Sequence, residues 1–365
     1  MIASFQRVSL VAVFFAQISC GSSAEAQATW TVTSAPTLTI GTDTSADFLS
    51  TVVGATRLPN GSILVGDRGD HALVLFDANG KLTRKFARKG KGPGEITDIA
   101  TDRFLRCGNR IAVLDNTSRQ LSLFGLDGTF ISRSRFLKLP YRFTCNDSVR
   151  FIMYEWERPS DAKKGAYRPL VPYWILRADS TPGVSLGSLP ASERFKEGPL
   201  GLGREPRVAL SNTRAYVALA DSMHILVFDM NGKALPPLRA PHKPVASTDA
   251  DWNAEIDRWV ALIGEKRRTM IVSMFDEMPR PRNLPATRDI IVDAQQNLWV
   301  QHFPRASQPT VTWTVFAPAG QVLATVQLPT ALEVYEIGND YVLGRYVNVD
   351  TEIPEVHLYK LSRTR

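Results

Sequence analysis

The side chains best suited to bind a ligand fall in short polar segments, each of which follows an apolar run. These segments are residues 67–71, 115–119, 155–172, 220–224, 302–310 and 348–355. Their arginines offer a planar fork of donors that suits an anionic or sugar-like ligand, although ordinary solvent-exposed loops have a similar composition. The candidate ligand-binding residues are Arg68, Asp70, Asn116, Arg119, Glu157, His302 and Arg305.

Oxygen-bearing side chains in the same segments could instead bind calcium, which takes about six to eight oxygen ligands. The residues that could supply them are Asp67, Asn116, Glu157 and Asp350, but no regular spacing singles them out. Asp67 and its counterpart Asp115 also suit a structural role, in which a carboxylate accepts backbone amides of its own loop. We therefore expect no cofactor, with Ca²⁺ as the alternative.

Other catalytic patterns have little support. No two of the five histidines have the spacing of zinc ligands. The chain also lacks the Gly-x-Ser-x-Gly sequence of a serine hydrolase. The catalytic residues are therefore unknown, and a protein without enzymatic activity is the favoured interpretation.

Two cysteines occupy matching positions in the sequence. Cys107 and Cys145 each lie four residues before an apolar run, which begins at Ile111 and at Val149. If the two runs belong to consecutive repeats of a ring-shaped fold, as the repeated phrase described below indicates, the turns before them approach one another near the ring axis. An oxidising compartment would then permit the two cysteines to pair. This spacing predicts a disulfide between Cys107 and Cys145.

A repeated phrase indicates which elements position these residues. Residues 63–80 contain an Asp-to-Phe-to-Gly spacing that recurs 48 residues later in residues 111–128. Its final part, Phe-x-x-x-Gly, returns at residues 228–232 and 316–320. A strand pair that recurs about every forty to fifty residues is typical of a β-propeller.

The remaining pattern predicts an all-β, six-bladed β-propeller with two special features. Residues 247–278 have helical spacing and form an insertion between blades 4 and 5, with Trp252, Ile256, Trp259, Val260 and Ile263 on one helix face. Blade 6 has three clear strands, and we expect residues 37–40 to supply its fourth. This N-terminal strand would close the ring and leave no unpaired sheet.

The first residues have the pattern of a signal peptide. Residues 1–26 combine Arg7, a short apolar run and a small-residue cleavage site. A lipoprotein signal ending at Cys20 is the alternative. Residues 27–365 would then form the exported propeller, periplasmic or extracellular, and no later stretch has the length of a transmembrane helix.

The chain is basic, with 43 Lys and Arg against 36 Asp and Glu and a net charge of +7. Such a balance could attract anionic surfaces, or it could simply reflect an ordinary basic surface. Nucleic acid is not an expected partner, because the chain has an export signal.

Three phrases resemble those of a known group of proteins. They are residues 55–61, the Gly- and Lys-rich residues 88–95, and residues 292–293 followed by 298–300. On these phrases, residues 30–364 resemble the exported bacterial six-bladed β-propeller proteins related to NHL-repeat and TolB-like propellers. The resemblance implies the fold, the export and the helical insertion, but no activity.

A rigid ring with variable loops on one face suits recognition of another molecule. We therefore expect a monomeric, exported binding or scaffold module that recognises a protein, peptide or glycan at one end of the central channel. The alternative, suggested by related six-bladed folds, is a calcium-dependent, lactonase-like hydrolase with its site at the channel mouth.

Overall fold

The computed structural model describes residues 29–42, 49–115, 117–136, 140–155, 165–177, 183–348 and 351–364. The expected signal peptide and Cys20 lie outside these ranges. So do Asn116, Glu157 and Asp350.

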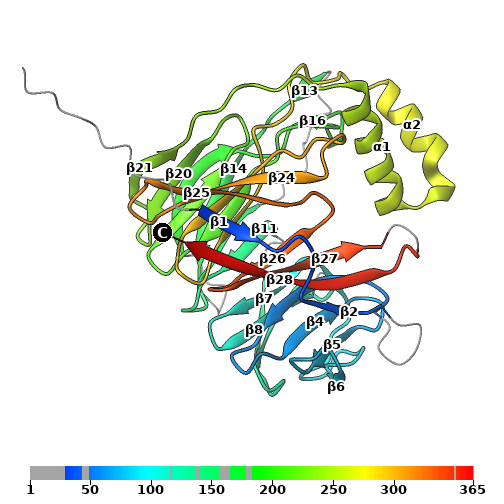
Figure 1. Ribbon diagram of the computed structural model, residues 1–365, viewed down its shortest axis with the longest axis vertical. Helices are drawn as coiled ribbons and strands as arrows, with labels where there is room; N and C mark the ends of the chain where they lie inside the picture. The colour runs from blue at the N-terminus through cyan, green and yellow to red at the C-terminus, as the bar shows by residue number, and fades with distance from the viewer. Residues whose placement is uncertain are drawn as a thin grey trace, which may run out of the picture.

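Six antiparallel sheets succeed one another around a central axis (Figure 1). Blade 1 contains β3 (Val52–Arg57), β4 (Ile63–Asp67), β5 (Ala72–Phe76) and β6 (Leu82–Phe86). Blade 2 contains β7 (Ile99–Cys107), β8 (Arg110–Asp115), β9 (Gln120–Gly125) and β10 (Phe130–Arg135). Blade 3 contains β11 (Pro140–Cys145), β12 (Phe151–Glu155), β14 (Leu170–Leu176) and β15 (Val184–Pro190).

The second half of the ring repeats this pattern. Blade 4 contains β18 (Arg207–Leu210), β19 (Arg214–Ala218), β20 (His224–Asp229) and β21 (Ala234–Arg239). Blade 5 contains β22 (Thr287–Val292), β23 (Leu298–His302), β24 (Thr310–Phe316) and β25 (Val322–Pro329). Blade 6 contains β26 (Glu333–Ile337), β27 (Tyr341–Val347) and β28 (Pro354–Thr364). A small separate sheet is formed by β13 (Ala166–Tyr167), β16 (Arg194–Phe195) and β17 (Gly198–Pro199).

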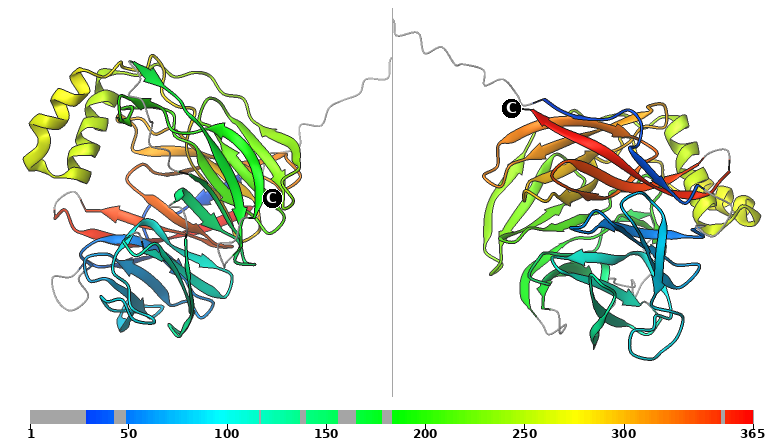
Figure 2. Two further views of the ribbon diagram at one scale, coloured as in Figure 1. Left: turned by 180° about the vertical axis from the view of Figure 1, so that it is seen from behind. Right: turned by 60° about the horizontal axis from the view of Figure 1, so that its bottom comes forward.

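The N-terminal residues complete blade 6, which confirms the predicted closure of the ring. The long strand β28 pairs with β2 (Leu38–Ile40) near its start and with β1 (Thr29–Val32) near its end. The outer strand of this blade is therefore built from two short strands. The sequence had indicated β2 but not β1. The right view of Figure 2 shows the N-terminal strands, in dark blue, beside β28, in red.

The core lies between neighbouring blades, because both faces of each sheet are covered. In β4, Val65 packs in a cluster with Leu343 and Val356 of blade 6, whereas its neighbour Leu64 packs with Phe104 of blade 2. Successive side chains of a strand point to opposite faces. A sheet buried on both faces therefore needs the continuous apolar runs that mark the repeat in the sequence.

The predicted insertion forms two helices, α1 (Asp249–Ile263) and α2 (Arg268–Asp276), between blades 4 and 5. The Thr248 side chain accepts the Asp251 amide and the Asp251 carboxylate accepts the Thr248 amide, which is a capping box that starts α1. The predicted apolar face of α1 packs on α2, where Trp252 and Trp259 lie edge-on to Phe275 at 5.1 and 5.8 Å. Figures 1 and 2 show the two helices together at one side of the ring.

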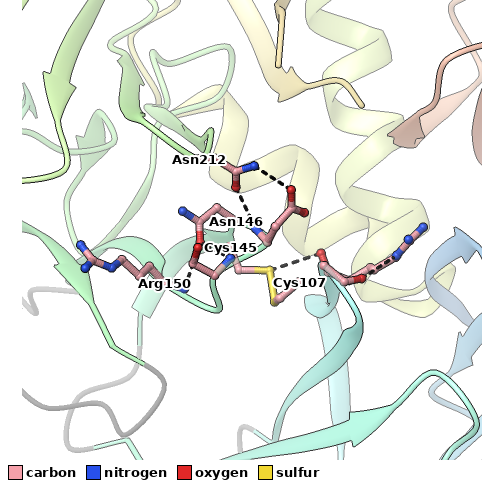
Figure 3. Close-up of a disulfide and its surroundings, with 9 residues drawn as sticks. Cys107, Cys145, Asn146, Arg150 and Asn212 are labelled. Atoms are coloured by element: carbon pink, nitrogen blue, oxygen red, sulfur yellow. Dashed lines mark hydrogen bonds between the residues drawn. A yellow bond between two sulfur atoms is a disulfide. The ribbon is translucent and has the colours of Figure 1, made fainter. Parts of the chain in front are cut away.

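A disulfide between Cys107 and Cys145 joins the last residues of β7 and β11, whose Cα atoms lie 5.6 Å apart (Figure 3). The link continues to blade 4, because the Asn146 side-chain amide donates to the Ser211 carbonyl at 3.2 Å. The innermost strands of blades 2, 3 and 4 are thus tied together at one end. Within the described part of the chain, no helix is long and apolar enough to cross a membrane.

Candidate functional site

A cavity of about 2860 Å³ follows the axis of the ring. We call it the central cavity. Residues of the first, innermost strand of every blade line it, from Val53 in β3 to Glu336 in β26. Helix α1 adds residues 251–262 at intervals, so the helical insertion forms part of its wall.

Five arginines in the wall of the central cavity form what we call the arginine cluster. Four come from the innermost strands of consecutive blades, one from each of β7, β11, β18 and β22, and the fifth comes from α1. The members are Arg103, Arg142, Arg207, Arg288 and Arg258. Neighbouring innermost strands run side by side around the axis, which brings these side chains to one region of the wall. Among the described lining residues there is no lysine and no histidine.

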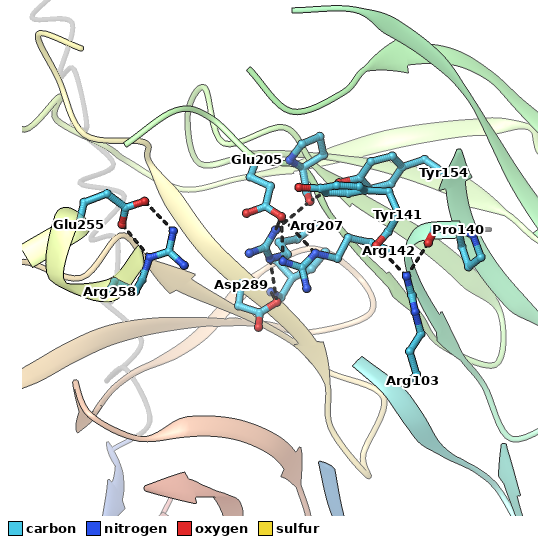
Figure 4. A network of polar contacts seen from close by, with 12 residues as sticks. Arg103, Pro140, Tyr141, Arg142, Tyr154, Glu205, Arg207, Glu255, Arg258 and Asp289 are labelled. Atoms are coloured by element: carbon cyan, nitrogen blue, oxygen red, sulfur yellow. Dashed lines mark hydrogen bonds and ion pairs between the residues drawn. The ribbon is translucent and has the colours of Figure 1, made fainter. Parts of the chain in front are cut away.

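Glu205 holds two members of the cluster in place (Figure 4). Its Oε1 atom lies 2.8 Å from Nη2 of Arg142 and 2.7 Å from Nη1 of Arg207. Burial alone would raise the pKa of Glu205, but the charges of Arg142 and Arg207 outweigh it and hold the pKa well below its ordinary value. Asp289 adds a second, longer ion pair to Arg207 at 3.7 Å. Glu205 is therefore an ionised, structural partner.

A second ion pair lies on α1. The Glu255 carboxylate accepts from Nε and Nη2 of Arg258 at 2.8 and 2.6 Å, and from Nε1 of Trp259 at 2.9 Å. Burial would raise the pKa of Glu255, but the hydrogen bonds and charge of Arg258 lower it. Figure 4 shows this pair on the helix, beside the network around Arg207.

Arg288 differs from the other members of the cluster. It makes no hydrogen bond or ion pair with any residue that the structure describes, and its guanidinium carbon lies 5.8 Å from the centre of the Phe303 ring. Burial, and then the positive charges of Arg207 and Arg258, lower the pKa of Arg288 to about 10. The five arginines face three nearby carboxylates (Glu205, Glu255 and Asp289), which leaves two positive charges in excess.

The structure brings some of the predicted ligand-binding residues to the central cavity. Arg68, Arg119 and Arg305 line it. Arg68 pairs with Asp98 at 2.9 Å, and Arg305 lies 4.0 Å from the Asp251 carboxylate at the start of α1.

Other predicted residues lie elsewhere. Asp70 pairs with Lys85 of the outer strand β6 at 2.5 Å, away from the cavity wall. His302 shares a hydrogen bond of 2.9 Å with the Thr314 hydroxyl and does not line the cavity. The candidates Asn116 and Glu157 lie outside the described residues.

Asp67 and Asp115 have the structural role that their repetition suggested. Asp67 accepts the backbone amides of Ser50, Thr51 and Gly69 at 2.9–3.0 Å. Asp115 accepts the equivalent amides in blade 2, including those of Thr97 at 2.6 Å and Ser118 at 2.9 Å. Each carboxylate thus fastens the loop after the second strand to the start of the first strand.

This role engages one of the four candidate calcium ligands. Within the described ranges, no group of three or more His, Cys, Asp or Glu side chains could hold a metal ion. Asn116, Glu157 and Asp350 lie outside those ranges. The calcium site therefore stays a prediction.

The predicted ligand-binding residues all come from the polar segments that follow apolar runs, so they do not include the arginine cluster. The available signal was an arginine in each of four consecutive innermost strands, as in Arg207-Val-Ala-Leu and Thr287-Arg-Asp-Ile-Ile-Val. A charged residue is rare in a strand covered on both faces. Its return in consecutive repeats indicates a common position on the axis.

Comparisons with known proteins agree with this architecture. The model of the family DUF5128, described as "6-bladed beta-propeller", matches residues 40–170. No curated protein sequence matches the chain.

Solved structures show the same fold at low sequence identity. A protein from Bacteroides fragilis that is classed as exported is 12% identical, with a TM-score of 0.52 over 92% of this chain and 96% of that one. A DUF4221 member from Bacteroides vulgatus is 11% identical, with a TM-score of 0.52 over 92% and 99% of the two chains. The likeness to virginiamycin B lyase from Staphylococcus aureus is weaker, with 9% identity, a TM-score of 0.40 and coverage of 85% and 94%. The six-bladed fold is thereby confirmed, whereas the NHL-repeat and TolB-like relationship stays a prediction.

Proposed function

We propose that this protein is a binding module that holds part of a peptide, protein or glycan in the central cavity. The observation that carries the proposal is the arginine cluster, which concentrates positive charge in one region of the wall of a cavity of about 2860 Å³. Positive charge focused in a cavity attracts and orients acidic ligands. The preferred ligand therefore carries acidic groups.

The lining also offers apolar contacts near the helical insertion. Leu262 on α1 is 74% exposed and Val347 at the end of β27 is 42% exposed, and both line the cavity. Apolar side chains beside a few charged groups are typical of ligand sites. A peptide or glycan with acidic and apolar parts fits this combination.

The two carboxylates that hold the arginine cluster are suited to a structural role in a binding site rather than to catalysis. A general acid or base works best when its pKa lies near the working pH. The pKa values of Glu205 and Glu255 are instead held low by their arginine partners. Both carboxylates are therefore suited to fix the arginines rather than to transfer a proton.

A bulky side chain introduced into the wall of the central cavity tests the proposal. Ala254 and Asn253 are exposed neighbours on α1, and of these two only Ala254 lines the cavity. Binding of acidic and neutral peptides and oligosaccharides to the wild type would be measured by titration calorimetry. We expect Ala254→Trp to weaken binding at least about tenfold and Asn253→Trp to leave it unchanged. The proposal would be contradicted if the wild type bound none of these ligands, or if a ligand bound Ala254→Trp and Asn253→Trp with the same affinity.

We also propose that the protein works outside the cytoplasm, as its N-terminal sequence predicts. The disulfide between Cys107 and Cys145 supports this, because such bonds persist mainly in oxidising compartments. Sequencing the N-terminus of the protein from its native host tests the proposal. A start at Gln27 is expected, a lipid-modified start at Cys20 would indicate the lipoprotein, and an unprocessed chain would contradict export.

A further inference from the structure

We propose that Arg288 is the anchor for an oxyanion of the ligand, either a carboxylate or a phosphate or sulfate group. The inference rests on the proposed binding function and assigns one residue and one chemical group to it. Arg288 lies in the innermost strand β22, in the wall of the central cavity, where a bound ligand would reach it.

The arginines of the cluster differ in their polar partners. Arg142 and Arg207 contact Glu205, and Arg258 contacts Glu255. Arg103 donates to the carbonyl oxygen of Pro140 at 2.5 Å. Arg288 is left with no polar partner among the residues that the structure describes, although its guanidinium carries as many donors as the others.

The position of Arg288 carries an electrostatic cost. A charged group removed from water is unfavourable unless it is paired, and like charges nearby add to that cost. Burial disfavours the charged form of Arg288 most, and Arg207 and Arg258 add to this effect, which the charges of Glu205 and Glu255 offset only in part. An anion in the cavity would offset all three effects at once, so its binding is favoured by groups already in place.

The shape of the Arg288 side chain also suits an oxyanion. The planar fork of a guanidinium matches two oxygens of a carboxylate or phosphate, and such paired bonds are among the strongest in proteins. The ring of Phe303 lies 5.8 Å from the guanidinium carbon, within the range of a cation–π contact, which uses none of the N–H donors. The donors of Arg288 thus stay available to a ligand.

The experiment compares Arg288→Gln with Arg345→Gln. Arg345 lines the same cavity but is paired with Glu333 at 2.7 Å, which makes it a matched control. Sodium phosphate and sodium acetate serve as separate probes, titrated at constant ionic strength with chloride so that general screening is held fixed. Thermal stability and calorimetric affinity are both measured, since a ligand that binds the folded state raises stability.

We expect the wild type to bind at least one probe saturably, and the phosphate and acetate titrations to show which oxyanion is preferred. Arg288→Gln should lose about tenfold or more in affinity, while Arg345→Gln keeps it. Without a probe, Arg288→Gln should melt at the same temperature as the wild type or higher, because the substitution removes an unpaired charge. Arg288→Lys keeps the charge but not the fork, so it should fold and bind weakly.

Equal affinity of Arg288→Gln and the wild type would overturn the anchor. So would binding of neither anion by the wild type. In both cases the peptide and glycan titrations with the Ala254→Trp variant still decide the proposed function independently. If a peptide or glycan binds in the cavity but Arg288→Gln does not weaken it, the module binds without this anchor.

Discussion

The guanidinium carbon of Arg363 lies 4.6 Å from the centre of the Trp30 ring, and this contact joins the two ends of the described chain. Trp30 and Arg363 are direct partners in the β1–β28 ladder. Arg363 also pairs with the buried Asp293 at 3.0 Å, and Trp30 lies 5.7 Å from the Trp299 ring. Closure of the ring therefore depends on side chains of blade 5 as well as on the backbone ladder of blade 6.

Replacing Trp30 with alanine should weaken this closure. We expect the free energy of unfolding in urea to fall by about 2 kcal/mol, because a large, partly buried aromatic ring is lost. Thr31→Ala, at an exposed position of the same strand, is the control and should change it by less than about 0.5 kcal/mol. Equal effects of the two substitutions would mean that the Trp30 contacts do not support the closure.

The disulfide should stabilise the protein by restricting the unfolded chain. The Cys107→Ala, Cys145→Ala double variant lacks the covalent link between these two positions, which are 38 residues apart. We therefore expect its free energy of unfolding to be lower than that of the wild type by about 2–4 kcal/mol. Dithiothreitol should destabilise the wild type by a similar amount and leave the double variant unchanged. A wild type insensitive to the reductant, with its thiols shown to be free by mass spectrometry, would contradict this prediction.

Glu336 should make stability depend on pH. Burial raises the pKa of Glu336. The hydroxyls of Thr56 and Tyr341, which donate to its carboxylate, and the charge of Arg106 at 3.9 Å offset this rise only in part. The folded state therefore holds this proton more tightly than the unfolded state, so stability falls as the pH rises from the unfolded pKa through the folded one.

Glu336→Gln removes this ionisable group. The variant should melt at a higher temperature than the wild type at neutral pH. The difference in melting temperature should shrink as the pH falls below the ordinary pKa of a glutamate. Melting curves at a series of pH values measure it. An advantage for the variant that is the same at every pH would show that packing, rather than ionisation, is responsible.

Calcium should leave the melting temperature unchanged if the protein is the binding module proposed above. The purified protein would be melted with excess calcium, with a chelator, and with magnesium as a control for ionic strength. Stabilisation by calcium alone would instead support the calcium-dependent hydrolase, with Asn116, Glu157 and Asp350 as the first ligands to replace. In that case hydrolysis of simple lactones becomes the decisive assay.

Much of the fold was predictable because its determinants are local. The Asp77-Ala-Asn-Gly80 turn shows why: the Asp77 carboxylate accepts the amides of Asn79 and Lys81 at 2.9 Å, and Gly80 adopts a positive φ of 84°. The helical spacing of Trp252, Ile256 and Trp259 likewise predicted the face of α1 that packs on α2. Strand β1 was missed because four residues with alternating exposure give little signal without their partner.

The candidate site was less predictable because it depends on distant residues. Arg142 and Glu205 are 63 residues apart, and Arg142 belongs to blade 3 whereas Glu205 immediately precedes blade 4. Nothing in the local sequence of either residue indicates the other. Arg68 and Asp70 are close in sequence, yet only Arg68 reaches the cavity, because the ring axis rather than the loop decides which side chains converge.

The position of the helical insertion separates two tasks within one chain. It connects β21 to β22, so every ladder of the six blades and the closing strands is formed by residues outside it. Yet α1 supplies Arg258, Glu255 and the exposed Leu262 to the cavity wall. Changes in the length or sequence of this segment would therefore alter the wall of the central cavity, and with it ligand specificity, while the strand ladders of the ring stay the same.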